Sequence, residues 1–139
     1  MTPLYAQEHN YSSYNLLVVD DIPLNVLLVQ KMLARFNFQV RTAANGQQAL
    51  DSVAVQKPDL ILLDLMMPGI DGFEVIRTLR ADPATADIQI IILSALNSNE
   101  DVVKGFNVGA NDFIMKPIIM EKLLSCVITQ MQVVEAKKH

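Results

Sequence analysis

The chain has 139 residues, 51% of them hydrophobic, which is enough to bury the core of one ordinary domain. A formal net charge of -4 and the lack of any basic block argue against a surface that holds nucleic-acid phosphates. A single cysteine, Cys126, excludes an internal disulfide, and no apolar run approaches the ~20 residues needed to cross a bilayer, so we expect a cytoplasmic protein without membrane insertion.

The two ends of the chain are polar and differ from the rest. Residues 1–14 lack the basic start and apolar run of a secretory signal, and we expect a flexible extension there. His9 and His139 fall in these terminal segments, where a solvated side chain is expected rather than a zinc ligand. One globular domain is therefore predicted for residues 15–134, with a tail at residues 135–139.

The first half of this domain alternates between strand and helix patterns. Residues 16–19 form a short apolar run that ends abruptly at two aspartates. Pro23 can open the next helix at its first turn, after which apolar residues recur on one face. Residues 39–43 alternate like a half-exposed edge strand, and residues 46–55 have a helical period. The face predicted for the first helix consists of Leu28, Val29, Met32, Leu33 and Phe36.

The second half continues the alternation. Residues 60–63 are wholly apolar and run into Asp64, and residues 90–93 run into Ser94 in the same way. Cys126 lies in the last helical stretch and is expected to pack in the core. The remaining predicted elements are a strand at 112–115 and helices at 72–80, 98–107 and 120–134, the last with an apolar stripe of Met120, Leu123, Leu124, Val127, Met131 and Val134.

The alternation of five strands with five helices predicts an α/β fold. Continuous apolar runs suit strands that are covered on both faces, as in a parallel sheet flanked by helices. Right-handed crossovers then favour a doubly wound, five-stranded parallel sheet of order 2-1-3-4-5. We expect a three-layer sandwich in which helices cover both faces of the sheet.

Polar residues at the strand ends should meet in such a sheet. Asp20 and Asp21 follow the first strand, Asp64 the third, Ser94 the fourth and Lys116 the fifth. Ligands bind outside the carboxyl ends of the strands, where the strand order reverses. Each residue alone could cap a helix or reach solvent, but five together in strongly apolar surroundings predict one site.

The three carboxylates at this edge would repel one another, so at least one should have a raised pKa unless a cation lies between them. Hard oxygen ligands favour Mg²⁺, which takes one or two carboxylates and retains water molecules. A carboxylate beside a metal and an ammonium group can attack phosphorus to form an aspartyl phosphate. Asp64 is best placed for this attack, with Lys116 offsetting charge on the phosphoryl oxygens and Ser94 donating to one of them.

The motifs that carry this chemistry resemble the receiver domains of bacterial two-component response regulators, the CheY-like proteins with a flavodoxin-like sandwich. The resemblance extends from about Asn15 to Val134. It implies a signalling domain, which promotes only its own phosphorylation and slow dephosphorylation, rather than an enzyme with a separate substrate. The matching segments are Val18 to Asp21, Leu63 to Gly72, Ser94-Ala95 and Lys116-Pro117.

The resemblance assigns roles to individual residues. It implies that Asp64 is the phosphoacceptor and that Asp21 and Asp64 ligate Mg²⁺ directly. Asp20 would assist from a second layer or through water, and the backbone carbonyl of Met66 would complete the protein ligands. Lys116 would precede a cis proline at Pro117.

The resemblance also implies a switch and partners. Ser94 would move toward the phosphoryl group while Phe113 swings inward, changing the face formed by the fourth helix, the fifth strand and the fifth helix. A protein effector would bind that face. The phosphoryl donor would be a histidine kinase or a histidine phosphotransfer protein, and the domain would be a monomer or a phosphorylation-dependent dimer.

Two apolar neighbours of the site should affect the lifetime of the phosphorylated state. Met66 and Leu96 lie two residues beyond Asp64 and Ser94, and neither can readily orient an attacking water, so we expect slow self-dephosphorylation.

Other classes of protein fit the sequence less well. Met66 stands where a haloacid-type phosphatase needs a general-acid aspartate. Asp20 and Asp21 would repel the phosphate of a flavodoxin-like cofactor. An interaction module that works without phosphorylation stays open as the alternative.

Overall fold

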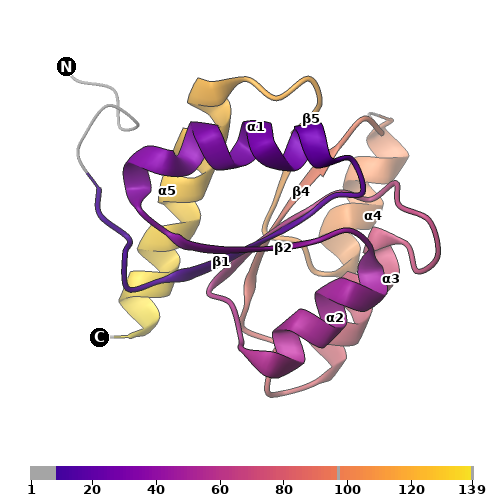
Figure 1. The fold of residues 1–139 in the computed structure, drawn as a ribbon. Helices are drawn as coiled ribbons and strands as arrows, with labels where there is room; N and C mark the ends of the chain where they lie inside the picture. Colours follow the sequence, from indigo (N-terminus) through magenta and orange to yellow (C-terminus); the bar gives the residue numbers. More distant parts are fainter. Residues whose placement is uncertain (1–8, 97, 139) are drawn as a thin grey trace.

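The computed structural model describes residues 9–96 and 98–138 and contains one five-stranded parallel sheet (Figure 1). The strands are β1 (Asn15–Val19), β2 (Gln39–Ala43), β3 (Leu60–Leu63), β4 (Gln89–Ser94) and β5 (Asp112–Met115). They lie in the order β2-β1-β3-β4-β5, which confirms the predicted doubly wound topology. Val19 lies beside Leu63, and Leu63 beside Ile92, so the carboxyl ends of the three central strands reach the same edge.

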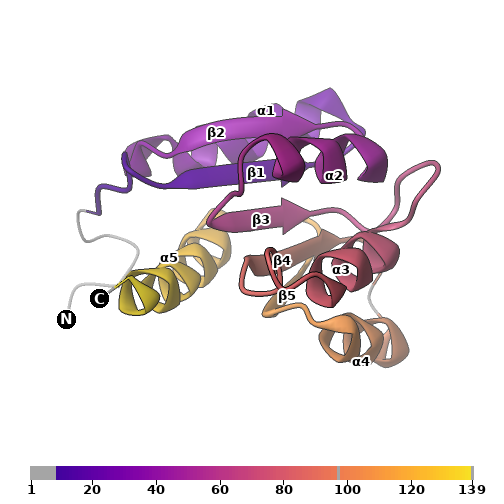
Figure 2. The same cartoon turned by 90° about the horizontal axis from the view of Figure 1, so that it is seen from below.

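Helices cover both faces of the sheet. The helical elements are α1 (Pro23–Leu33), the short 3-10 helix η2 (Ala34–Phe36), α2 (Gly46–Val55), α3 (Gly72–Ala81), α4 (Asn99–Val108) and α5 (Met120–Lys137). Alternate strand residues enter two separate apolar clusters, one packed with α1 and α5 and the other with α2, α3 and α4. Figure 2 shows the layers from below. The predicted three-layer sandwich is therefore confirmed.

The first helix buries a narrower face than the sequence pattern predicted. Pro23 occupies the first turn as expected, and Val29 and Leu33 are buried. Leu28 was predicted to join this face, but 46% of it is exposed. The α-helix ends at Leu33, and η2 then turns Phe36 into the core. The predicted helix therefore continued into residues 34–36, where the structure has the 3-10 helix η2 instead.

Residues 9–14, which the sequence placed in a flexible extension, pack against the domain. The Tyr11 side chain is only 3% exposed, and its backbone N–H donates to the Phe36 carbonyl over 2.7 Å. The Tyr11 hydroxyl lies 3.2 Å from Nδ1 of His9, so that histidine is half-buried rather than solvated. Burial raises the pKa of Tyr11 to about 12, with the nearby Glu135 as the next cause. The rest of the extension, residues 1–8, and His139 lie outside the described residues.

Helix α5 is longer than predicted and continues through Lys137, so residues 135–137 of the expected tail are helical. Most of its predicted stripe is buried, except Met120, which is exposed at the first turn. Cys126 is half-buried against the core, and burial raises its pKa to about 12. Within residues 9–96 and 98–138, no helix combines the length and hydropathy that a bilayer crossing requires.

Candidate functional site

The structure brings the predicted polar residues to the carboxyl edge of the sheet. The backbone N–H of Asp64 donates to the Val19 carbonyl over 2.9 Å, which holds the end of β3 beside the end of β1. Asp20, Asp64 and Ser94 are all buried, although each is polar. Lys116 follows β5, and its backbone N–H donates to the Ser94 carbonyl over 2.8 Å. Residues from four strand ends therefore converge.

Three carboxylates form an acidic cluster at this edge. Asp20, Asp21 and Asp64 each offer one oxygen, and these oxygens all lie within 4.8 Å of one another. Asp20 is held firmly, because its Oδ1 accepts from the Ile22 backbone over 2.9 Å and its Oδ2 from Asn25 over 3.2 Å. Asp21 is exposed at the rim. An all-oxygen group of this kind is suited to a hard divalent cation.

The Lys116 ammonium group bridges two of these carboxylates. Its Nζ lies 3.1 Å from Oδ2 of Asp20 and 3.4 Å from Oδ2 of Asp64. The peptide bond between Lys116 and Pro117 is cis. Because all three side chains are largely buried, the attraction acts in a medium of lower polarity than water and is screened less than a surface pair would be.

The buried surroundings of Asp64 shift the acidity of its carboxyl group. Burial raises the pKa of Asp64 above its ordinary value and is the largest influence. The Met66 N–H, which donates to Oδ1 over 3.1 Å, and the charge of Lys116 both lower this pKa, whereas the charge of Asp20 raises it. The predicted direction is confirmed, but loss of water around the carboxylate contributes more than the expected mutual repulsion.

Asp64 and Ser94 are held by similar local turns at the ends of neighbouring strands. Each side chain accepts a hydrogen bond from the backbone N–H two residues later, Asp64 from Met66 and Ser94 from Leu96, both over 3.1 Å. These turns fix the start of the loops after β3 and β4. The Met66 side chain is exposed beside the site, and that of Leu96 is half-buried.

Phe113 lies in the core on the side of the sheet that α4 covers. Its ring packs so closely on Gly105 of α4 that a Cβ added to this glycine would lie 3.1 Å from the ring. The same Cβ would lie 2.9 Å from Ile92. The ring therefore occupies an inward, buried position in this structure, and only glycine at position 105 allows α4 to approach it this closely.

The sequence interpretation missed two residues that shape the site. Asn25 donates to Asp20, and Gly105 receives the Phe113 ring. Asn25 could have been found, because the first turn of a helix that follows an acidic strand end faces the same edge of the sheet. Gly105 gives no such signal, since a glycine in a helical segment does not reveal which side chain packs against it.

Comparison with known proteins identifies the family of the chain. The model of the response regulator receiver domain matches residues 16–128. The response regulator PleD of Caulobacter vibrioides is 46% identical over 106 residues, which cover 76% of this chain and 23% of that protein. The chain thus spans about a quarter of the length of this relative. Protein PilH of Pseudomonas aeruginosa is 36% identical over 112 residues, covering 81% of this chain and 93% of PilH.

Solved structures agree with this assignment. The signal receiver domain of a signal transduction histidine kinase from Syntrophus aciditrophicus superposes with a TM-score of 0.81 at 32% identity, covering 87% of this chain and 92% of that one. The receiver domain DrrB, in a form described as BeF3-activated, superposes with a TM-score of 0.78 at 28% identity, covering 86% and 97%. Together with the family match and the converging strand ends, these likenesses show that the chain belongs to the response regulator receiver domains of two-component signalling.

Proposed function

We propose that this domain is a phosphorylation switch in which Asp64 accepts a phosphoryl group. The observation that supports this most strongly is the placement of a buried Asp64 carboxylate 3.4 Å from the Lys116 ammonium group and within the acidic cluster of Asp20 and Asp21. A buried carboxylate in this setting is poorly solvated, which favours a nucleophile over an ordinary surface acid. The exposed rim at Asp21 gives a donor access from outside.

The acidic cluster fits a Mg²⁺ ion. Asp21 and Asp64 would be the direct carboxylate ligands, and the Met66 carbonyl would be a third protein ligand. Asp20 suits a role through water, because its oxygens already accept hydrogen bonds from Ile22, Asn25 and Lys116. When bound, the ion would offset negative charge that the acidic cluster and the phosphoryl oxygens bring together.

The proposed transfer forms a bond between an Asp64 carboxylate oxygen and phosphorus. The bond between phosphorus and the donor atom breaks, and the donor nitrogen of a phosphohistidine leaves with the electron pair. Lys116 would then turn its ammonium group toward a phosphoryl oxygen, and the Ser94 hydroxyl would donate to another. A histidine kinase or a histidine phosphotransfer protein would be the donor.

The output would be a change on the face formed by α4, β5 and α5. Ser94 accepts from Leu96 and would have to leave this local turn to reach a phosphoryl group. Phe113 contacts α4 through Gly105, so its packing can follow that change. Large apolar side chains of these elements are exposed and would suit a protein effector; they are Val103, Phe106, Met115 and Met120. The oligomeric state would be a monomer or a phosphorylation-dependent dimer.

The test of this function is uptake of phosphate from a small donor. Incubation with MgCl₂ and acetyl phosphate should add the mass of one phosphoryl group to the intact chain, and peptide mapping should place it on Asp64. Excess EDTA should prevent the gain. A mass that stays unchanged in MgCl₂ would contradict the proposed switch and would favour an interaction module that works without phosphorylation.

Mg²⁺ is also expected to change the stability of the fold. In EDTA, Asp64→Asn should raise the free energy of unfolding, because a buried carboxylate is replaced by a neutral amide of similar size. MgCl₂ should stabilise the wild-type protein, by about 2.7 kcal/mol at 100 times the Kd, and should stabilise the variant much less. Urea unfolding in both buffers measures this without any phosphoryl transfer. Equal stabilisation of both proteins would argue against Asp64 as a metal ligand.

The phosphorylated state is expected to decay slowly, because Met66 and Leu96 cannot orient water for attack. Met66→Asn should place an amide beside Asp64 and accelerate the loss of phosphate severalfold. Decay can be followed by intact mass after the donor is removed. Met67→Leu is the control, since Met67 is buried in the core next to the same loop. A wild-type lifetime of only seconds, unchanged by Met66→Asn, would refute the proposed role.

A further inference from the structure

Arg80 lies outside the site and connects three segments of the fold. It is in the last turn of α3, and its guanidinium group donates to the Gly109 carbonyl over 2.9 Å and to Oδ1 of Asn111 over 2.9 Å. The same group donates to the carbonyls of Ala86 and Ile88 over 2.9 and 2.6 Å. One side chain thus binds the loop after α3 and the loop between α4 and β5.

These bonds hold the carboxyl-terminal end of α4. Gly109 caps the helix in the left-handed conformation, with φ at 118°. A Cβ on this glycine would lie 2.8 Å from the Arg80 side chain, so the cap and the arginine are in close contact. Asn111 continues the attachment, because its N–H donates to the Ile90 carbonyl over 2.8 Å and its Oδ1 accepts from the Ile90 N–H over 2.7 Å.

The amino-terminal end of α4 is attached differently. Ser98 caps this end by accepting from the Asp101 N–H over 3.1 Å, and its hydroxyl donates to the Asp101 carboxylate over 2.7 Å, so these bonds stay within the helix. Asn99 and Glu100 are exposed. A polar cap of this kind stabilises a helix end without fixing it to the rest of the domain.

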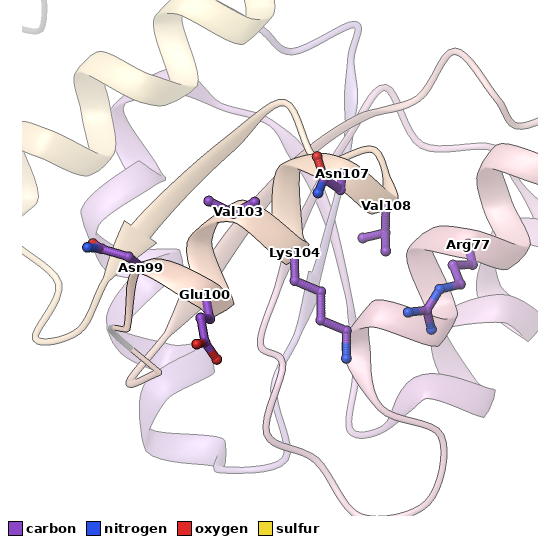
Figure 3. Close-up of a pocket in the computed structure, with 7 residues that line it drawn as sticks. All are labelled: Arg77, Asn99, Glu100, Val103, Lys104, Asn107 and Val108. Atoms are coloured by element: carbon purple, nitrogen blue, oxygen red, sulfur yellow. The ribbon is translucent and has the colours of Figure 1, made fainter.

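A groove of about 550 Å³ runs beside α4, with Arg77 of α3 among its lining residues (Figure 3). Lys104 extends into it from α4, and its Nζ lies 4.3 Å from the centre of the Phe73 ring of α3. Space beside a helix allows it to move without displacing closely packed side chains. Gly105 touches the Phe113 ring one turn before the cap at Gly109, so a change at β5 reaches α4 on the amino-terminal side of that cap.

We propose that Arg80 is a positioning residue that fixes the carboxyl-terminal end of α4, so that the helix moves about Gly109 while its amino-terminal part is displaced along the groove. This inference rests on the proposed phosphorylation switch and deepens it, because it states which part of α4 responds. Arg80 thereby confines the response to the amino-terminal end of α4, which follows β4 and its last residue, Ser94.

The first test uses the unphosphorylated protein and does not depend on the switch. Hydrogen exchange is measured at amides 102–105 and 107–111 in the wild type, in Arg80→Gln and in Arg77→Gln. Arg80→Gln should accelerate exchange at 107–111 about tenfold or more, because several hydrogen bonds to a charged group are lost. Arg77→Gln is the matched control on the same helix, since Arg77 donates to exposed Glu74 one turn away, and it should leave 107–111 unchanged.

The second test adds MgCl₂ and acetyl phosphate, with phosphorylation of each sample measured by intact mass. In the wild type, exchange should change at 102–105 and stay constant at 107–111. In Arg80→Gln, the change should extend through 107–111. If Arg80→Gln does not fold, Arg80→Lys replaces it, because lysine keeps the charge but cannot reach all four acceptors.

The outcomes separate this inference from the proposed function. A chain that takes up no phosphate contradicts the switch, and the exchange data on unphosphorylated protein then still decide whether Arg80 fixes the end of α4. A chain that is phosphorylated but responds equally at both ends of α4 overturns the inference and leaves the switch intact. Equal exchange at 107–111 in the wild type and both Arg80 variants overturns it as well.

Discussion

Replacing Lys116 by methionine is expected to slow phosphorylation of Asp64 by about 100- to 1,000-fold, the usual loss when one group that stabilises developing charge is removed. Methionine keeps much of the volume of the lysine stem but removes the ammonium group that lies between Asp20 and Asp64. Without it, two buried carboxylates lose their shared counter-charge, and the incoming phosphoryl oxygens lose a donor. Initial rates of mass gain in MgCl₂ and acetyl phosphate measure the effect.

Two reference variants and a test of folding make this measurement specific. Asp64→Asn should show no uptake, which sets the lower limit. Lys31→Met removes an exposed lysine from α1 and should match the wild type. Circular dichroism should show that Lys116→Met is folded under the assay conditions. Uptake by this folded variant at the wild-type rate would contradict the role of Lys116.

Replacing Tyr11 by alanine is expected to lower the free energy of unfolding by about 3 kcal/mol or more, as for other large buried aromatic residues. The Tyr11 ring contacts Phe36, with centroids 5.6 Å apart, and stacks on Phe38 at 5.1 Å. Both phenylalanines lie around the short turn between α1 and β2, so a cavity would open beside that turn. Urea unfolding of the full chain measures the change.

Two further variants separate the ring from its surroundings. Tyr11→Phe keeps the ring and removes only the contact with His9, so the loss should be about 1 kcal/mol. Ser12→Ala changes an exposed neighbour and should stay within about 0.5 kcal/mol of the wild type. If Tyr11→Ala were as stable as Ser12→Ala, residues 9–14 would not belong to the folded domain. The family match begins at residue 16, after this segment.

The parts of the site that depend on strand ends could be predicted from the sequence. An apolar run that stops at Asp64 or Ser94 indicates both the strand and the position of its carboxyl end, and parallel strands bring such ends to one edge. The topology then places Lys116 near Asp64, although 52 positions separate them in the chain. Local sequence patterns suffice here, because the right-handed crossover between parallel strands is the only further rule needed to arrange the strand ends.

The parts that depend on tertiary packing could not be predicted. Tyr11 lies in a polar segment with no periodic pattern, and its ring partners Phe36 and Phe38 come from the distant turn between α1 and β2. Arg80 reads as an ordinary basic residue near a helix end, yet all its acceptors lie on loops whose course the sequence does not specify. Leu28 fits the helical period and lies within α1, yet it is 46% exposed, because the face of α1 that packs on the core is narrower than the period indicates.

The shielding of the Asp20–Lys116–Asp64 bridge has a consequence for ionic strength. These side chains are 8%, 19% and 6% exposed, whereas those of the surface pair Lys57 and Asp87 are 46% and 57% exposed. Dissolved ions screen exposed pairs over about 8 Å at physiological salt but hardly reach buried ones. The step at Asp64 should therefore tolerate added salt, and any marked salt dependence with a protein donor would report the encounter of the two outer surfaces.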